Sequence, residues 1–331
     1  LAFFVLVNGI NLLHVRLFGE MEFWLSIVKV VAIMAMIGFG AWLLASGTGG
    51  EQAAVSNLWA LGGFFPNGIS GLLLAMAVIM FSFGGLELVG ITAAEADDPG
   101  KTIPKATNQI IYRILIFYIG ALAVLMSLYP WNLMEEGSSP FVMIFHSLDA
   151  TAVATVLNVV VLTAALSVYN SCVYCNSRML YGLALQGNAP RALTRVNKRG
   201  VPSAALGVSA AATAAVVVVN YLMPEGAFGM LMLLVVAALV INWAMISITH
   251  LMFRRRMAAE GRSPAFPSPG APVTNWLCLV FLAGILVVMW FTPGIRTAIL
   301  LMPAWLALLS VMYWLRRRQG PSAAAAPQPG A

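Results

Sequence analysis

Eight apolar runs, each long enough to cross a lipid bilayer, occupy most of this chain of 331 residues. A spanning α-helix needs about 20 consecutive apolar residues, because each residue advances the helix by about 1.5 Å. Helices are the expected form, since backbone exposed to lipid must satisfy its hydrogen bonds within its own segment. The runs cover residues 23–45, 69–91, 107–129, 150–175, 203–222, 227–251, 273–291 and 297–315. The sequence therefore predicts an all-α membrane protein.

The composition agrees with a chain that lies in lipid. Hydrophobic residues make up 61% of it and charged residues only 9%, whereas a soluble domain carries about 25% charged residues. Three cysteines are too few for a disulfide framework in a chain of this length. Cys172 and Cys175 form a C-x-x-C pair inside an apolar run, and we interpret them as small packing residues because no metal-ligand set accompanies them.

The two ends of the chain differ from the spans between them. Residues 1–13 are apolar but too short to cross a bilayer, and they lack the basic start of a signal peptide. We interpret them as the end of a helix whose beginning is absent, so that the chain is an N-terminally truncated piece of a larger protein. Residues 319–331 are rich in Ala, Pro and Gly, and we expect them to form a disordered cytoplasmic tail.

Basic residues occupy every second connection between the apolar runs. They lie at Arg16 and within residues 101–105, 178–199, 254–262 and 316–318, while the alternate connections lack Lys and Arg except for Arg296. Lys and Arg favour the cytoplasmic side of a membrane. The pattern predicts a cytoplasmic C-terminus. It also explains the net charge of +6 by topology, so we expect no nucleic-acid partner.

The run at 69–91 contains two features that an ordinary spanning helix avoids. Gly84 and Gly85 are adjacent in mid-run, and Glu87 follows two residues later. Glycines lower the cost of unwinding, and unwound backbone is tolerated at membrane depth only where it lines a cavity enclosed by protein. Broken helices of this kind point to the binding site of a transporter. The alternative is that both glycines only allow a neighbouring helix to pack closely.

The charged residues in the runs have two interpretations each. Glu87 either faces the bundle interior, where it binds and releases protons, or lies near the cytoplasmic interface and extends to water or pairs with a lysine. Lys29 lies seven residues into a run that opens with Phe23 and Trp24. It either extends its amine to the cytoplasmic surface or is held between helices. Glu95, Asp97 and Asp98 are expected in a solvated loop.

Several long stretches resemble the amino acid–polyamine–organocation superfamily of permeases, most closely its bacterial aromatic amino acid permeases. The stretches are "FGEMEFWLSIVKVVAIMAMI", "FSFGGLELVGITAAEADDPGKTIPKATNQIIYRILIFYIG", "LNVVVLTAALSVYNSCVYCNSRMLYGLALQGNAP" and "LVINWAMISITH". The resemblance implies a leucine-transporter-like fold with inverted five-helix repeats, here lacking helices 1–3 and part of helix 4. It divides the chain into residues 1–13 (end of helix 4), 14–68 (helix 5 and an outer loop), 69–251 (helices 6–10, the second repeat), 252–318 (helices 11 and 12) and the tail.

The resemblance also implies a set of site residues. Backbone carbonyls of Phe81, Ser82 and Phe83, exposed by the break at Gly84 and Gly85, would bind the substrate ammonium, and the Phe81 ring would cover the substrate. Two other positions correspond to the coupling site of proton-driven relatives. There Lys29 would take the place of a sodium ion, and the hydroxyl of Ser167 would line the same pocket.

The function implied is proton-coupled import of the aromatic L-amino acids phenylalanine, tyrosine and tryptophan by alternating access. The alternative is a permease of the same fold for another amino acid, such as proline, alanine or γ-aminobutyrate. We expect no metal and no cofactor, with the proton gradient as driving force, and partners limited to the amino acid, protons and the bilayer of a bacterial inner membrane. The protein is expected to be a monomer or a weak oligomer.

An enzyme is not expected. The chain has no H-E-x-x-H, no G-x-S-x-G and no paired aspartates within its apolar runs. His146 lies in a stretch that resembles the extracellular lid segment of the fold and is not interpreted as a catalytic base. Asn170 is expected to join its helix to neighbours by structural hydrogen bonds, and Trp243 is interpreted mainly as a packing residue, with gating as the alternative.

Overall fold

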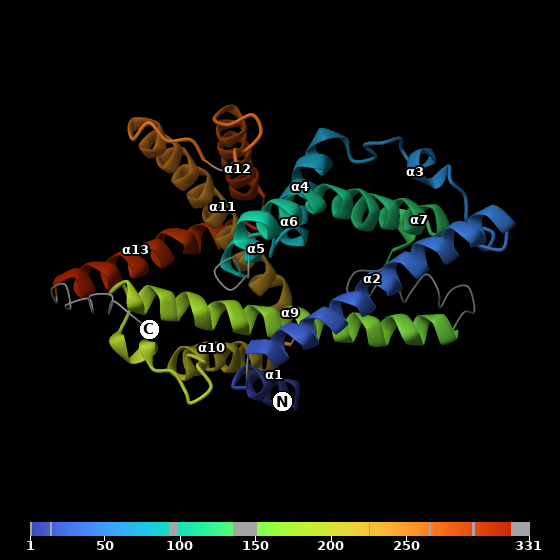
Figure 1. The fold of residues 1–331 in the computed structure, drawn as a ribbon. Coiled ribbons are helices and arrows are strands. Elements are labelled where there is room, and N and C mark those ends of the chain that lie inside the picture. The colour runs from blue at the N-terminus through green and yellow to red at the C-terminus, as the bar shows by residue number, and fades with distance from the viewer. Residues whose placement is uncertain are drawn as a thin grey trace. The chain divides into compact units, whose positions relative to one another are not determined.

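The computed structural model describes residues 2–13, 15–92, 98–134, 151–224, 226–264, 266–292 and 295–318. Within these ranges every regular element is a helix (Figure 1). The all-α membrane protein that the sequence predicts is confirmed, because seven of the described helices are long and apolar enough to cross a membrane. His146, Glu95, Asp97 and the tail lie outside the described residues.

The chain divides into two compact units. The first comprises Leu1–Pro66 and Lys105–Ala211, and the second comprises Asn67–Pro104 and Ala212–Ala331. Two helices continue from one unit into the other, namely α6 (Pro99–Arg113) and α10 (Ser203–Leu222). Each unit has its own apolar core.

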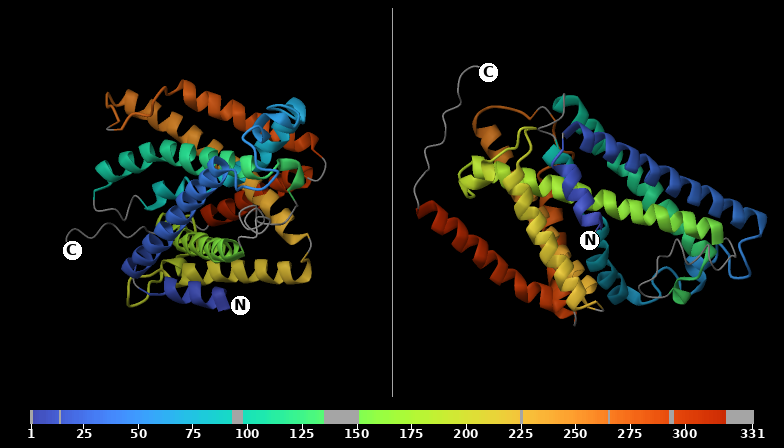
Figure 2. Two further views of the ribbon diagram at one scale, coloured as in Figure 1. Left: turned by 90° about the vertical axis from the view of Figure 1, so that its right-hand side faces the viewer. Right: turned by 90° about the horizontal axis from the view of Figure 1, so that it is seen from below.

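The first unit is built around three helices that pack on one another. Its longest helices are α2 (Val15–Ser46) and α9 (Thr151–Leu185), which lie side by side (Figures 1 and 2). Helix α7 (Ala121–Leu128) packs on α2. The remaining elements are α1 (Ala2–Asn11), α3 (Asn57–Ala60), the π-helix η2 (Ile114–Gly120) and the 3-10 helices η3 (Trp131–Leu133) and η4 (Arg191–Thr194).

Small residues bring the helices of the first unit close together. A Cβ added to Gly40 of α2 would lie 2.4 Å from Val124 Cγ1 of α7, so only glycine fits at this contact. Around it, Met36, Leu43, Leu125 and Leu128 form the buried core. Close side-chain packing is the main attraction available here, since lipid tails are as apolar as the helices.

The second unit contains the interrupted helix. Helix α4 (Gly68–Ser82) contacts both α11 (Ala227–Ala259) and α12 (Val273–Phe291), which also pack on each other. The short α5 (Leu88–Thr92) follows α4, and α13 (Arg296–Arg318) completes the unit. Its buried core includes Ala77 and Met80 of α4, Val236 and Val240 of α11, and Met289 of α12.

The described helices differ from the predicted runs in two ways. First, the run at 69–91 is not one full span, because it is divided into α4 and α5 by the turn at residues 83–87. Second, several helices continue beyond the apolar runs into polar sequence. Helix α2 begins at Val15 instead of residue 23, α9 ends at Leu185 instead of residue 175, and α11 ends at Ala259 instead of residue 251. Hydrophobicity marks the depth of the membrane, and it does not mark the last hydrogen-bonded turn of a helix.

Candidate functional site

The helix break predicted at the glycine pair is present in the second unit. Helix α4 ends at Ser82, the chain turns through residues 83–87, and α5 begins at Leu88. At the break, the N–H groups of Phe83 and Gly84 donate to the carbonyls of Met80 and Phe81, at 3.3 and 3.1 Å. These bonds span three residues instead of four, so the helical ladder ends in a tight turn.

Both interpretations of the glycine pair apply, one to each residue. Gly85 has φ +100°, a left-handed conformation that residues with a Cβ rarely adopt. Gly84 instead marks a close approach. A Cβ there would lie 2.9 Å from Leu239 Cδ1 of α11 and 3.2 Å from the Phe81 carbonyl oxygen. Gly85 therefore makes the break possible, and Gly84 lets α11 pack against it.

The carboxylate of Glu87 holds the turn from within. Its Oε2 accepts the backbone N–H of Gly85 at 3.1 Å and the indole Nε1–H of Trp243 at 3.3 Å. Glu87 and Trp243 are both half-buried. The acid therefore satisfies a backbone donor that the broken helix has released, as a capping residue does at a helix end. Trp243, interpreted from the sequence mainly as a packing residue, is a hydrogen-bond donor to this acid.

A cavity of about 560 Å³ adjoins the break within the second unit. Its walls come from α4, α11, α12 and the turn, and they are apolar apart from a few groups that include Glu87 and the Trp243 indole. A volume of this order suits a small organic molecule, and pockets of this kind usually combine apolar walls with few polar groups. Phe83 and Phe281 place aromatic rings in the wall.

The predicted substrate residues do not all lie in this cavity. Phe83 lines it, whereas Phe81 and Ser82 are not among the lining residues, and 42% of Phe81 is exposed. The Phe81 carbonyl accepts the Gly84 N–H, which occupies one of its two acceptor positions. The binding roles of Phe81, Ser82, Phe83, Gly84 and Gly85 stay predictions.

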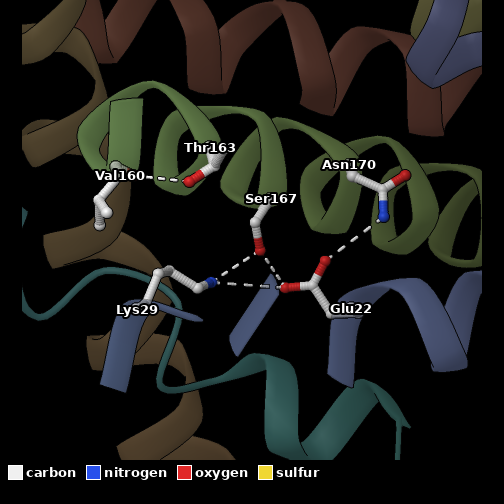
Figure 3. Close-up of polar contacts among 6 residues, drawn as sticks. All are labelled: Glu22, Lys29, Val160, Thr163, Ser167 and Asn170. Carbon is white, nitrogen blue, oxygen red and sulfur yellow. Dashed lines mark hydrogen bonds and ion pairs between the residues drawn. The ribbon is translucent and has the colours of Figure 1, made fainter. Parts of the chain in front are cut away.

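A second polar cluster lies between α2 and α9 in the first unit. The ammonium of Lys29 donates to the Ser167 hydroxyl oxygen, with 2.7 Å between Nζ and Oγ (Figure 3). Lys29 therefore points toward α9, which is the inward arrangement of the two that the sequence allows. Ser167 is fully buried, and the Lys29 side chain is 25% exposed. The structure brings together the two residues expected to couple protons, and their coupling role stays a prediction.

Sequence reasoning missed the acid in this cluster, Glu22. The Ser167 hydroxyl donates to Glu22 Oε1, and Lys29 Nζ lies 3.7 Å from the same oxygen (Figure 3). The side chain of Glu22 is 22% exposed. One signal was present in the sequence, because residues seven apart lie on the same face of a helix after two turns. Glu22 escaped notice because it precedes the apolar run that starts at residue 23.

Two asparagines extend the cluster to α1. The Asn170 amide Nδ2 donates to Glu22 Oε2 at 3.4 Å, and its Oδ1 accepts from Asn11 Nδ2 at 2.8 Å (Figure 3 shows the Asn170–Glu22 bond). Asn11 and Asn170 are both buried. The expectation that Asn170 joins its helix to its neighbours by hydrogen bonds is confirmed.

Comparison with known proteins identifies the family. Residues 1–324 match the family described as amino acid permease. This chain belongs to the amino acid permease family. It is 62% identical over 317 residues to the aromatic amino acid transport protein AroP of Escherichia coli O6:H1, a match that covers 96% of this chain and 70% of AroP. The AroP of Shigella flexneri is also 62% identical, with 96% and 69% covered.

A more distant relative has a less specific name. The amino-acid permease AapA of Bacillus subtilis is 42% identical over 312 residues, with 94% of this chain and 68% of AapA covered. With seven apolar spans among its described residues, this permease is a multi-pass protein of the bacterial inner membrane. It is a transporter and not an enzyme, as the sequence predicts.

Several other side chains of α9 were considered in the sequence or lie near the polar cluster. Cys172 is exposed and Cys175 is buried, and the two form no disulfide. Near the start of α2, the Phe18 ring stacks on Tyr174 of α9 with 4.0 Å between centroids. The Arg178 guanidinium covers the Tyr174 ring at 3.6 Å. In the described part of the chain, no group of three or more His, Cys, Asp or Glu side chains could hold a metal ion.

Proposed function

We propose that this permease imports aromatic L-amino acids together with protons, by alternating access. The observation that carries the substrate class is the 62% identity, over 96% of this chain, to proteins named aromatic amino acid transport proteins. The lower identity of 42% to AapA, whose name carries no aromatic class, favours phenylalanine, tyrosine and tryptophan over proline, alanine or γ-aminobutyrate.

The broken helix supplies the chemistry for the substrate. Carbonyl oxygens of Phe81, Ser82 and Phe83 at the turn would attract an ammonium group without adding a full charge to the membrane. The ring of an aromatic substrate would contact aromatic side chains near the break. Such ring pairs contribute about 0.5–1.5 kcal/mol beyond the burial of area. Gly85 makes the turn possible, and Gly84 lets α11 pack against it.

Two charged sites support the use of protons. Lys29 carries an amine within a spanning helix and donates to Ser167 at 2.7 Å. An amine that carries a proton, at a place where other transporters bind a metal cation, would allow the proton to replace that cation. Glu87 is the second proton-binding group in the proposal, because its carboxylate bonds directly to the turn. The charge pattern of the loops supports a cytoplasmic C-terminus.

Uptake by cells that produce the protein at its natural full length tests this proposal. Uptake of radiolabelled phenylalanine is measured with an inward proton gradient and with a protonophore. Unlabelled tyrosine and tryptophan are expected to compete, whereas proline, alanine and γ-aminobutyrate are not. If proline or alanine inhibits phenylalanine uptake as strongly as tyrosine does, the proposed aromatic substrate class is wrong. Accumulation that survives the protonophore would remove the proton from the proposal.

A further inference from the structure

Both carboxylate oxygens of Glu22 have partners within the protein. Its Oε1 accepts the Ser167 hydroxyl and lies 3.7 Å from Lys29 Nζ, and its Oε2 accepts the Asn170 amide. Ser167 and Asn170 are both fully buried. These partners come from α9 and from α2 itself, so that the acid is held at the contact between the two helices.

A charged pair at this place is costly. Removing an ammonium and a carboxylate from water is only partly offset by their attraction, and a neutral pair of side chains would join the helices at lower cost. Ionisable residues inside spanning helices mark ion and proton pathways in membrane proteins. The presence of the Lys29–Glu22 pair therefore favours a function that includes the transfer of a proton or an ion.

The arrangement of Lys29, Ser167 and Glu22 provides a path along which a proton can pass. The Ser167 oxygen lies between the other two, receiving a hydrogen bond from Lys29 and donating its own to Glu22 (Figure 3). We propose that Glu22 accepts the proton carried by Lys29, with the Ser167 hydroxyl as the relay. The inference rests on the proposed proton coupling and adds the residue that receives the proton.

The transfer conserves atoms and charge. One N–H bond of the Lys29 ammonium breaks as its proton bonds to Ser167 Oγ, and the O–H proton of Ser167 bonds to Glu22 Oε1. The products are a neutral amine, an unchanged hydroxyl and a neutral carboxylic acid, and no group is oxidised or reduced. Glu22 then gives its proton to water and regains its charge, while Lys29 is ready for another proton.

The position of Glu22 on α2 gives the transfer a direction. Glu22 lies two turns, or about 10 Å, nearer the Val15 end of α2 than Lys29 does. Arg16 is at that end, and the charge pattern of the loops predicts that it faces the cytoplasm. Glu22, whose backbone is the nearer of the two to that end, would then release the proton toward the cytoplasm, as uptake requires.

The asparagines fix the second oxygen of the acid. Asn11 Nδ2 donates to Asn170 Oδ1 at 2.8 Å, which turns the amide nitrogen of Asn170 toward Glu22. Asn170 can donate to Oε2 whether the carboxyl group is charged or neutral, so the group keeps its place through the transfer. The elements packed against this part of α2 also carry titratable or charged groups, which are Tyr118, Tyr169, Cys172, Tyr174, Cys175, Arg178 and Tyr181.

The test compares Glu22→Gln with Glu20→Gln, an exposed acid two residues earlier on the same helix. The full-length protein is reconstituted in vesicles. Uptake driven by a proton gradient is measured beside the exchange of labelled for unlabelled phenylalanine at equal pH. We expect Glu22→Gln to lose gradient-driven uptake by about 100-fold, an ordinary effect of removing a placed proton acceptor, and to keep exchange. Glu22→Asp should recover part of the uptake, and Glu20→Gln should match the wild type.

The other outcomes overturn the inference. If Glu22→Gln retains gradient-driven uptake, Glu22 is not the acceptor. If it loses exchange as well and Glu22→Asp does not recover it, the acid only holds the helices together. A wild-type protein that exchanges phenylalanine but ignores the proton gradient defeats the proposed coupling itself.

Infrared difference spectra provide a readout that does not depend on transport. On acidification other carboxylates, Glu87 among them, also add to the protonated-carboxyl absorption, so the spectrum of Glu22→Gln is subtracted from that of the wild type. The band that remains reports Glu22, and Glu20→Gln should retain it. A subtraction that leaves no band would show that Glu22 takes no proton.

Discussion

Trp243 donates its indole N–H to the carboxylate oxygen of Glu87 that also receives the backbone N–H of Gly85, with an Nε1–Oε2 distance of 3.3 Å. One oxygen thus joins the broken helix to α11, which carries Trp243. Any change in the charge of Glu87 would alter both bonds at once. In the proposed mechanism, a proton on Glu87 would therefore act directly on the turn.

Replacing Glu87 by Gln separates its charge from its role as an acceptor. The amide oxygen of Gln can still accept the Gly85 and Trp243 donors, so the turn and membrane insertion should persist. Proton-driven phenylalanine uptake should fall sharply, because the amide of Gln does not take up a proton as a carboxylate does. Uptake is measured from about pH 5 to pH 8. Glu51→Gln, an exposed acid of the first unit, is the matched control. An unchanged pH profile for Glu87→Gln would count against a role for this acid in coupling.

Trp243→Phe tests the hydrogen bond between α11 and the turn. Phenylalanine keeps an aromatic ring in the cavity wall but removes the donor to Glu87. A hydrogen bond to a charged group contributes about 1.5–3 kcal/mol. We expect a thermal unfolding midpoint lower by several degrees and weaker phenylalanine uptake. Trp276→Phe changes an exposed tryptophan of α12 and should leave both values as in the wild type. Equal midpoints for the two variants would show that the bond contributes nothing to stability.

The sequence was sufficient for the features that follow from local chemistry. Apolar length predicted the spans, and the glycine pair predicted the break between Ser82 and Leu88, because both depend on residues close together in the chain. Span ends were less predictable. Backbone hydrogen bonding, and not contact with lipid, decides where a helix ends. Helix α2 therefore includes polar residues such as Glu22 that lie outside the apolar run.

The contacts that define the two polar clusters required the structure. Glu22 is 145 residues from Ser167, and Glu87 is 156 residues from Trp243. No spacing rule connects positions so far apart, because helix packing decides which faces meet. For Lys29 and Ser167 the resemblance to a family suggested a shared pocket. The spacing of seven residues placed Glu22 on the same helix face as Lys29 but did not indicate its contact with Ser167, and no signal connected Trp243 with Glu87. The N–H of a half-buried tryptophan usually has a hydrogen-bond acceptor, but only the fold shows which residue supplies that acceptor.

Substitutions of Gly84 and of Gly85 should destabilise the protein for different reasons. Gly85→Ala forces a side chain into φ +100°, with a strain of about 1–3 kcal/mol that no neighbour can relieve. Gly84→Ala instead meets Leu239 of α11, so the added change Leu239→Ala should restore part of its stability and uptake. Gly90→Ala in α5, where an added Cβ has nothing within 4 Å, is the control. Thermal unfolding and phenylalanine uptake are measured for each. Rescue of Gly85→Ala by Leu239→Ala would contradict the division of roles.

Lys29→Ala should abolish gradient-driven uptake while the protein still inserts and folds. The change removes the amine that donates to Ser167 and leaves Glu22 with the Ser167 hydroxyl and the Asn170 amide as donors. Without the amine, the carboxylate of Glu22 has no cationic partner at the helix contact, and the proposed transfer of a proton between the two groups cannot take place. Lys101→Ala is the matched control, since the Lys101 side chain is 90% exposed. Its ion pair with Asp98, with 3.2 Å between Nζ and Oδ2, lies at the surface. Phenylalanine accumulation is measured in vesicles with and without a proton gradient. Accumulation by Lys29→Ala equal to that of Lys101→Ala would mean that the amine near Ser167 has no part in coupling.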